Sequence, residues 1–197
     1  TLVIGKHEHN WQPITEIPLD FEPTRWNRLR VDFNGNKATV WLNGIRIHEF
    51  EDTNNPLTKG HIGLRSFDGS ASFRNLSVNG NAVAFNALPI GVSGFRHYDY
   101  TWTTDGTTLS TATPAHAKII YSGSEMQKGS AEVTLRHDGN QAITGLIFDV
   151  TEAGNGSDNF RGYEVSLDAA KKTLVIGKHE HNWQSIDNLP VEFNAED

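Results

Sequence analysis

Short runs of alternating apolar and polar residues dominate this chain, and they predict strands rather than helices. In residues 29–33 leucine, valine and phenylalanine alternate with arginine and aspartate. A second apolar run covers 38–42, and the dipeptide Asn43-Gly44 separates it from a third run over 45–48. Asn-Gly between two such runs is the strongest local signal for a β-hairpin. The pattern therefore predicts a meander of short antiparallel strands.

Similar runs recur at the spacing that is typical of a β-sandwich. We predict further strands over 60–67, 71–79, 116–121, 130–138, 142–150, 163–168 and 173–180, the last two as a hairpin. Helical spacing of apolar residues does not extend over a useful length. The expected fold class is all-β, an antiparallel jelly-roll β-sandwich.

One segment occurs twice. Residues 1–12 and 173–184 both read TLVIGKHEHNWQ, and the offset of 172 residues has the size of a domain rather than of a solenoid repeat. We therefore expect a piece of tandem, near-identical modules. Residues 1–80 would be the C-terminal half of one module, 81–92 a linker, and 93–197 the N-terminal part of the next. In permuted order these segments supply every strand of one sandwich.

One sandwich has a single place for the duplicated segment, so either 1–25 or 173–197 is surplus. The surplus copy keeps its apolar residues, and an unpaired strand edge seeks a partner. We expect it to pair with another chain, as a domain-swapped dimer or a head-to-tail array. The sequence does not choose between closure within a chain and exchange between chains.

Composition narrows the range of partners. The net charge of −7 argues against nucleic acid and anionic membrane surfaces, which both need basic patches. No run approaches the length of a membrane-spanning helix, so we expect no membrane insertion. The chain has no cysteine, which excludes a thiol nucleophile, a disulfide and cysteine-ligated zinc.

Framework residues spaced along 25–78 form a recognisable pattern. They are Trp26, Leu29, Val40, Gly44, Phe50, Asp52, Gly60, Gly63, Leu64, Phe73, Asn75 and Val78. This pattern resembles the C-terminal half of concanavalin A-like jelly rolls of the laminin-G type, and residues 101–180 are similar to the opening half of such domains. In permuted order the chain resembles the levan-binding modules attached to bacterial exo-levanases and the sandwich domains of family-32 glycoside hydrolases.

The resemblance implies a non-catalytic carbohydrate-binding module that needs no cofactor. Its ligand would be a polysaccharide or oligosaccharide, of fructan (levan) type or a similar neutral glycan. It would serve an attached polysaccharide-degrading enzyme, outside the cell or at the cell surface. The alternative is a structural or adhesive repeat without a sugar site. A third and weaker interpretation is a sugar-active enzyme of the sandwich type.

The first candidate site lies in the second copy of the duplicated segment. Lys178, Glu180 and Trp183 combine an aromatic ring, which can stack on a sugar, with charged groups that bind hydroxyls. A polar strand end whose tryptophan covers the core is the competing interpretation. His179 and His181 share a strand face, but zinc needs three or four ligands and no third is evident.

The second candidate is Arg161, Tyr163 and Glu164, which follow a loop rich in Gly, Asn and Asp. Loops at the ends of sandwiches often carry binding groups, and an arginine beside a carboxylate can bind vicinal hydroxyls. A merely solvated loop is the alternative.

The oxygen atoms of Glu152, Asn155 and Asp158 in the same loop could instead hold structural calcium.

The third candidate is Arg65 with Asp68, at the end of a predicted strand. An aromatic row in 96–102, which includes Tyr98, could be a sugar platform or, more simply, the cover of a sheet.

Catalysis has little support, because the predicted strands 130–138 and 142–150 offer only Glu132 and Asp149, whereas glycosidases need two carboxyl groups flanking the bond.

Overall fold

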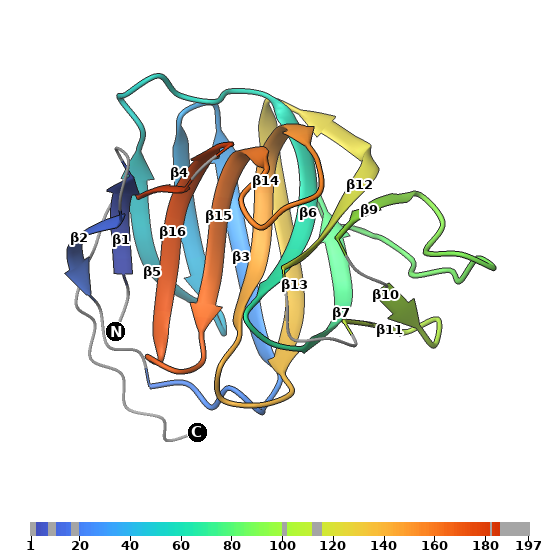
Figure 1. Ribbon diagram of the computed structural model, residues 1–197. Helices are drawn as coiled ribbons and strands as arrows, with labels where there is room; N and C mark the ends of the chain where they lie inside the picture. The colour runs from blue at the N-terminus through green and yellow to red at the C-terminus, as the bar shows by residue number, and fades with distance from the viewer. Residues whose placement is uncertain are drawn as a thin grey trace.

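The structure is a computed structural model, and its strands form two sheets stacked face to face (Figure 1). The backbone is described for residues 3–7, 11–16, 20–99, 102–111, 116–181 and 183–185, and side chains for 20–99, 102–111 and 116–181. Every described element is a strand, turn or loop. A helix able to cross a bilayer is therefore absent from this part of the chain.

Sheet A contains nine of the described strands. In spatial order they are β2 (Trp11–Glu16), β1 (Val3–His7), β16 (Thr173–Glu180), β15 (Phe160–Asp168), β14 (Ile143–Ala153), β6 (Gly60–Phe67), β12 (Ala117–Met126) and β9 (Phe95–Tyr98), with β17 (Trp183–Ser185) paired to β16. All neighbours are antiparallel except β1 and β16.

Sheet B contains eight of the described strands. Their order is β10 (Trp102–Thr104), β11 (Thr108–Thr111), β7 (Ala71–Val78), β13 (Lys128–His137), β3 (Asn27–Asn34), β4 (Lys37–Leu42) and β5 (Ile45–Glu51), with β8 (Asn81–Ala82) paired to β7. The predicted all-β antiparallel sandwich is confirmed. The short strands β9, β10 and β11 were not predicted, because 3–4 residues are too few to show a period.

Strands from the two parts of the chain alternate within each sheet. β6 lies between β14 and β12 in sheet A, and β13 lies between β7 and β3 in sheet B. Residues before and after the segment 81–92 thus build one common core, and the origin of the chain from tandem modules stays a prediction.

The core follows directly from the alternation in the sequence. Leu29, Val31 and Phe33 of β3 are buried between the sheets, while the residues between them point to solvent. Burial of such side chains stabilises the fold by about 25 cal/mol for each Å² of apolar surface removed from water. A second, smaller buried cluster lies apart from the main core, and its members are Ile120, Ile147, Val150 and Phe160. It belongs to the outer face of sheet A and shows that part of this face is covered.

The two copies of the duplicated segment form the same hairpin and occupy different places. β16 pairs with β15 over its whole length, from Thr173 to Glu180. β1 lies at the other edge of β16, in parallel register, with Val3 opposite Val175 and Ile4 opposite Ile176. The second copy therefore occupies the position beside β15, which is the single place that the sandwich offers to this segment. The first copy lies on the sheet edge of its own chain, and exchange with another chain stays a prediction.

Candidate functional site

A buried charged cluster lies on the outer face of sheet A. Side chains alternate along a strand, so Glu164 points outward because Tyr163 and Val165 are core residues. By the same rule Arg65 follows the core residue Leu64 on β6. The strands β15, β16, β14 and β6 are neighbours, and they bring Arg65, Glu164 and His179 together although 99 residues separate the first two.

Glu164 is the centre of this cluster. Its carboxylate accepts hydrogen bonds from Arg65 Nη1 at 2.8 and 3.1 Å, from Ser166 Oγ at 2.6 Å and from His179 Nε2 at 2.8 Å. Arg65 also contacts Asp158 Oδ1 at 2.9 Å. Glu164 is only 1% exposed and His179 is fully buried. Such a network is held rigidly because its polar groups bond to one another rather than to water.

The environment fixes the charge of both groups. Burial alone would raise the pKa of Glu164, but the positive charge of Arg65 and the hydrogen bond from His179 outweigh it and bring that pKa to about 2. Burial lowers the pKa of His179, and the neighbouring Arg65 charge acts in the same direction. At neutral pH the pair is therefore a carboxylate and a neutral imidazole that donates its Nε2 proton.

A loop between β14 and β15 covers this cluster. Lys118 Nζ donates to the carbonyl of Gly156 at 2.6 Å and to Asp99 Oδ2 at 2.8 Å. The other Asp99 oxygen accepts the amide proton of Gly156, and Arg65 Nη2 donates to the carbonyl of Ser157. Figure 1 shows the loop curling across the sheet beside β14 and β6. We call residues 154–159 the covering loop.

An open groove of about 310 Å³ adjoins the covering loop on the same face. Its lining residues are Arg96, Tyr98, Ile120, Val150, Thr151, Glu152 and Ala153. Among the described residues Arg96 makes no side-chain hydrogen bond or ion pair, and the ring of Tyr98 is half-buried. The groove thus offers an aromatic ring, a free guanidinium and a carboxylate at one accessible place. We call it the sheet A groove.

Two predicted site residues lie on the opposite face of the same strands. Tyr163 donates its hydroxyl proton to Asp52 Oδ2 at 2.9 Å, and Lys178 Nζ donates to the same oxygen at 2.7 Å. Burial raises the pKa of Tyr163. Both side chains face the core and hold the 52–57 segment through the backbone of Asn54 and Leu57. A ligand in solvent has no path to them, so the structure assigns them a structural contact.

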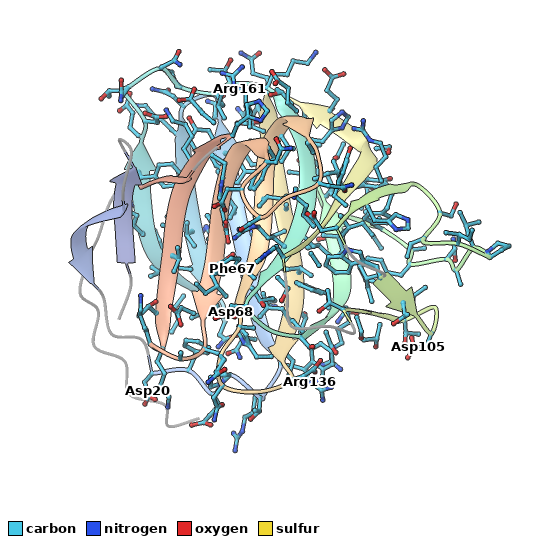
Figure 2. The ribbon with its side chains drawn as sticks, viewed as in Figure 1. Asp20, Phe67, Asp68, Asp105, Arg136 and Arg161 are labelled. Carbon is cyan, nitrogen blue, oxygen red and sulfur yellow. The ribbon has the colours of Figure 1, made fainter. Side chains whose placement is uncertain are left out.

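The remaining predicted residues are spread over the molecule. Arg161 and Glu180 form an ion pair at 3.4 Å, at the end of sheet A where β15 begins. Asp68 is exposed at the opposite end of β6, and Figure 2 shows how far it lies from Arg161. The side chain of Trp183 lies outside the described residues. The structure therefore brings six of the eight predicted residues together in three separate pairs, Arg65 with Glu164, Tyr163 with Lys178 and Arg161 with Glu180, and not as one site.

The loop oxygens that could hold calcium do not converge. Glu152 binds His181 and Arg161, Asn155 accepts the amide proton of Asp99, and Asp158 binds Arg65. Within the described ranges, no group of three or more histidine or acidic residues could hold a metal ion. Calcium at this loop stays a prediction from the composition of the loop.

The two carboxylates considered for catalysis are far apart. Glu132 belongs to β13 of sheet B, and Asp149 belongs to β14 of sheet A. Asp149 is fully buried, and burial raises its pKa to about 7. These two groups therefore cannot flank a glycosidic bond as a pair.

Sequence reasoning missed Lys118 and Asp99. Lys118 lies in an apolar run of β12, and a lysine in such a run is itself a signal, because a buried ammonium group requires a partner. Asp99 adopts a positive φ of 74° beyond the end of β9. Only the fold shows that these two residues meet beneath the covering loop.

A family model, described as the 3-keto-alpha-glucoside-1,2-lyase-like domain, matches residues 5–79. The match is less than half of the chain. It includes Arg65 but not Glu164, His179 or the sheet A groove. The chain is thus similar to a carbohydrate-related family over this segment, which supports the sugar-related part of the sequence resemblance. No curated protein matches the chain.

Proposed function

We propose that the domain binds a neutral glycan, of fructan (levan) type or similar, in the sheet A groove. The observation that carries this proposal is the open groove in which the Tyr98 ring, the Arg96 guanidinium and the Glu152 carboxylate lie together. In this proposal the module is non-catalytic, acts outside the cell or at its surface, and holds an attached polysaccharide-degrading enzyme near its substrate.

The chemistry of the groove suits a sugar. An aromatic ring can cover the apolar face of a pyranose or furanose, while a guanidinium donates and a carboxylate accepts hydrogen bonds from hydroxyl groups. The floor of the groove is apolar, since Ile120 and Val150 line it. One wall is formed by Thr151, Glu152 and Ala153, which lead directly into the covering loop, and Lys118 and Arg65 hold that loop in place. A wall held in place lowers the entropy cost of binding.

Isothermal titration with levan, inulin and fructo-oligosaccharides tests the proposal. We expect weak binding in the wild type, and we expect Tyr98→Ala to reduce the affinity by about tenfold or more, since a stacked ring contributes on the order of 1–3 kcal/mol. Asp68→Ala is the comparison variant, because this exposed carboxylate lies at the other end of β6. Loss of binding in Asp68→Ala alone would move the site to that end. An absence of binding to every glycan on an array would favour the structural or adhesive repeat.

A second candidate function is a sugar lyase, and the Glu164–His179 pair favours it together with the name of the matching family. Elimination beside a keto group begins when a base removes a proton, and a nearby cation stabilises the developing oxyanion. Glu164 and His179 could move the proton, and Arg65 could supply the positive charge. The covering loop would have to open to admit a substrate, since the three side chains are at most 6% exposed.

Incubation with a 3-keto-α-glucoside distinguishes the two functions. A lyase would release the aglycone, and Glu164→Gln would abolish that release while Tyr98→Ala would alter mainly KM. A binding module would release nothing under the same conditions and would still bind glycan in the titration.

A further inference from the structure

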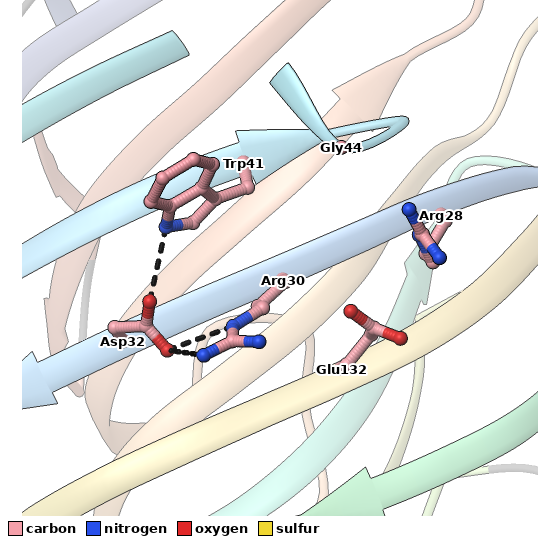
Figure 3. Close-up of a pocket in the computed structure, with 6 residues that line it drawn as sticks. All are labelled: Arg28, Arg30, Asp32, Trp41, Gly44 and Glu132. Carbon is pink, nitrogen blue, oxygen red and sulfur yellow. Dashed lines mark hydrogen bonds and ion pairs between the residues drawn. The ribbon is translucent and has the colours of Figure 1, made fainter. Parts of the chain in front are cut away.

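A second groove lies on the outer face of sheet B, on the opposite side of the sandwich from the sheet A groove. It measures about 390 Å³, and its lining residues are Arg28, Arg30, Asp32, Trp41, Gly44 and Glu132. Figure 3 shows the five side chains around this hollow, on the neighbouring strands β4, β3 and β13. We call it the sheet B groove.

The aromatic ring of this groove is held in a fixed position. Trp41 Nε1 donates to Asp32 Oδ2 at 3.0 Å, while Arg30 donates from Nε and Nη2 to Asp32 Oδ1 at 2.8 and 2.7 Å. One carboxylate therefore orients both an indole ring and a guanidinium group on an exposed surface. A side chain that is already ordered loses less entropy when a ligand binds.

Two further charged side chains, Glu132 and Arg28, face the hollow and are available to bind a ligand. Glu132 lies in register with Arg30, which in turn lies opposite Trp41, so the three side chains form one row across the strands. Neither Glu132 nor the Arg28 side chain makes a hydrogen bond or ion pair within the part of the chain that the structure describes. Gly44, with φ of +87°, leaves room for Arg28, since a Cβ at Gly44 would lie 3.1 Å from its Nη2.

The charges identify the class of ligand. Two guanidinium groups and two carboxylates balance to zero, which favours neither an anion nor a cation. The groove instead offers donors and acceptors beside an aromatic ring, the combination that suits a neutral polyhydroxyl compound. We infer that the sheet B groove is a second saccharide-binding site, with Trp41 as the stacking platform and Arg28, Glu132 and Arg30 as the hydroxyl-binding groups.

This site does not depend on the sheet A groove. The two grooves lie on opposite outer faces, so one module could hold two glycan chains at once. A polymer that is long and flexible enough to reach both faces would bind more tightly than to either site alone.

A matched control exists on the same face. Trp26, which comes directly before β3, is also half-buried, but the guanidinium carbons of Arg74 and Arg136 already lie 4.1 and 4.9 Å from its ring centroid. The ring of Trp26 is therefore already in contact with two guanidinium groups of the protein. Trp26→Ala removes an indole from this face without touching the sheet B groove.

The test uses calorimetric titration of the full chain with tetrasaccharides of fructose, glucose, galactose and mannose. In a Tyr98→Ala background we expect residual binding, which Trp41→Ala weakens at least tenfold and Trp26→Ala leaves unchanged. Trp41→Phe keeps a ring and should retain part of the affinity, which guards against a folding defect in the alanine variant. Equal affinities in Trp41→Ala and Trp26→Ala would overturn the inference.

The outcomes also separate this inference from the proposed function. Loss of all binding in Tyr98→Ala alone would overturn the second site and leave the first intact. Loss of all binding in Trp41→Ala alone would overturn the site in the sheet A groove and leave the site in the sheet B groove intact. A wild type that binds none of the four tetrasaccharides would overturn both.

Discussion

Tyr163 and Glu164 are neighbours in β15, and their side chains leave the strand on opposite faces of sheet A. Tyr163 bonds to Asp52 on the core side and helps to anchor the 52–57 segment. Glu164 bonds to Arg65 on the outer side, and Arg65 in turn holds the covering loop. Two adjacent residues of β15 therefore help to hold two separate segments in place, the 52–57 segment on the core side and the covering loop on the outer side.

Breaking the buried Arg65–Glu164 pair should strongly destabilise the fold. Arg65→Met leaves the Glu164 carboxylate buried without its main counter-charge, which typically costs about 3–5 kcal/mol. Urea denaturation measures this change in the free energy of unfolding. The double variant Arg65→Met/Glu164→Gln should recover part of the loss. The exposed pair Arg46–Glu49 is the control, and exposed pairs contribute below about 1 kcal/mol. A change of similar size in Arg46→Ala would contradict the expectation.

Asp149→Asn should stabilise the protein increasingly as the pH rises. The pKa of Asp149 is raised to about 7, so the folded state binds a proton that the unfolded state has lost. Stability from this group is complete below about pH 4 and falls as the pH rises to about 7, by at most about 4 kcal/mol. Asn adopts the positive φ of this position readily.

The measurement is the difference in the free energy of unfolding between variant and wild type at pH 4.5 and pH 8. The difference is needed because His137 and His179 have pKa values lowered mainly by burial. Stability from these groups is present above about pH 6.5 and is lost as the pH falls, which opposes the trend from Asp149. An advantage of Asp149→Asn that is the same at both pH values would show that the carboxyl group does not titrate in this range.

The covering loop should loosen when Asp99 is removed. One oxygen of its carboxylate accepts the amide proton of Gly156, and the other holds the Lys118 ammonium that bonds to the Gly156 carbonyl. Hydrogen exchange at the Gly156 amide should therefore be slow in the wild type and much faster in Asp99→Ala. Asp105→Ala is the control, since Asp105 accepts backbone protons in a different turn. Equal exchange at Gly156 in both variants would show that Asp99 does not hold the loop.

The sequence predicts the strands well and the site poorly, for a physical reason. The strand pattern is local, and the predicted run 60–67 coincides with β6. The charged clusters depend on contacts between residues far apart, such as Lys178 with Asp52 at a separation of 126 residues. Strand alternation alone could have shown that Tyr163 and Glu164 cannot share a site. It could not show that Arg65 would meet Glu164, because that requires the order of the strands.

The duplicated segment leads to the last prediction. Deleting residues 1–18 should leave the sandwich folded, since β16 pairs with β15 over eight residues, whereas β1 pairs with β16 at two positions among the residues that the structure describes. The cut spares Phe21, which is a core residue. Ending the chain at residue 172 should instead destabilise the sandwich, because the deletion removes the core residues Leu174 and Ile176, unless the first copy, which has the same sequence, moves into the vacant place. Thermal unfolding measures both effects.

Light scattering at high concentration tests self-association, which we expect in the full chain and not in the chain that lacks residues 1–18. The in-register contact between Val3 and Val175 could equally form between two chains. A full chain that stays monomeric at every concentration would show that its first copy remains on its own sheet and does not exchange.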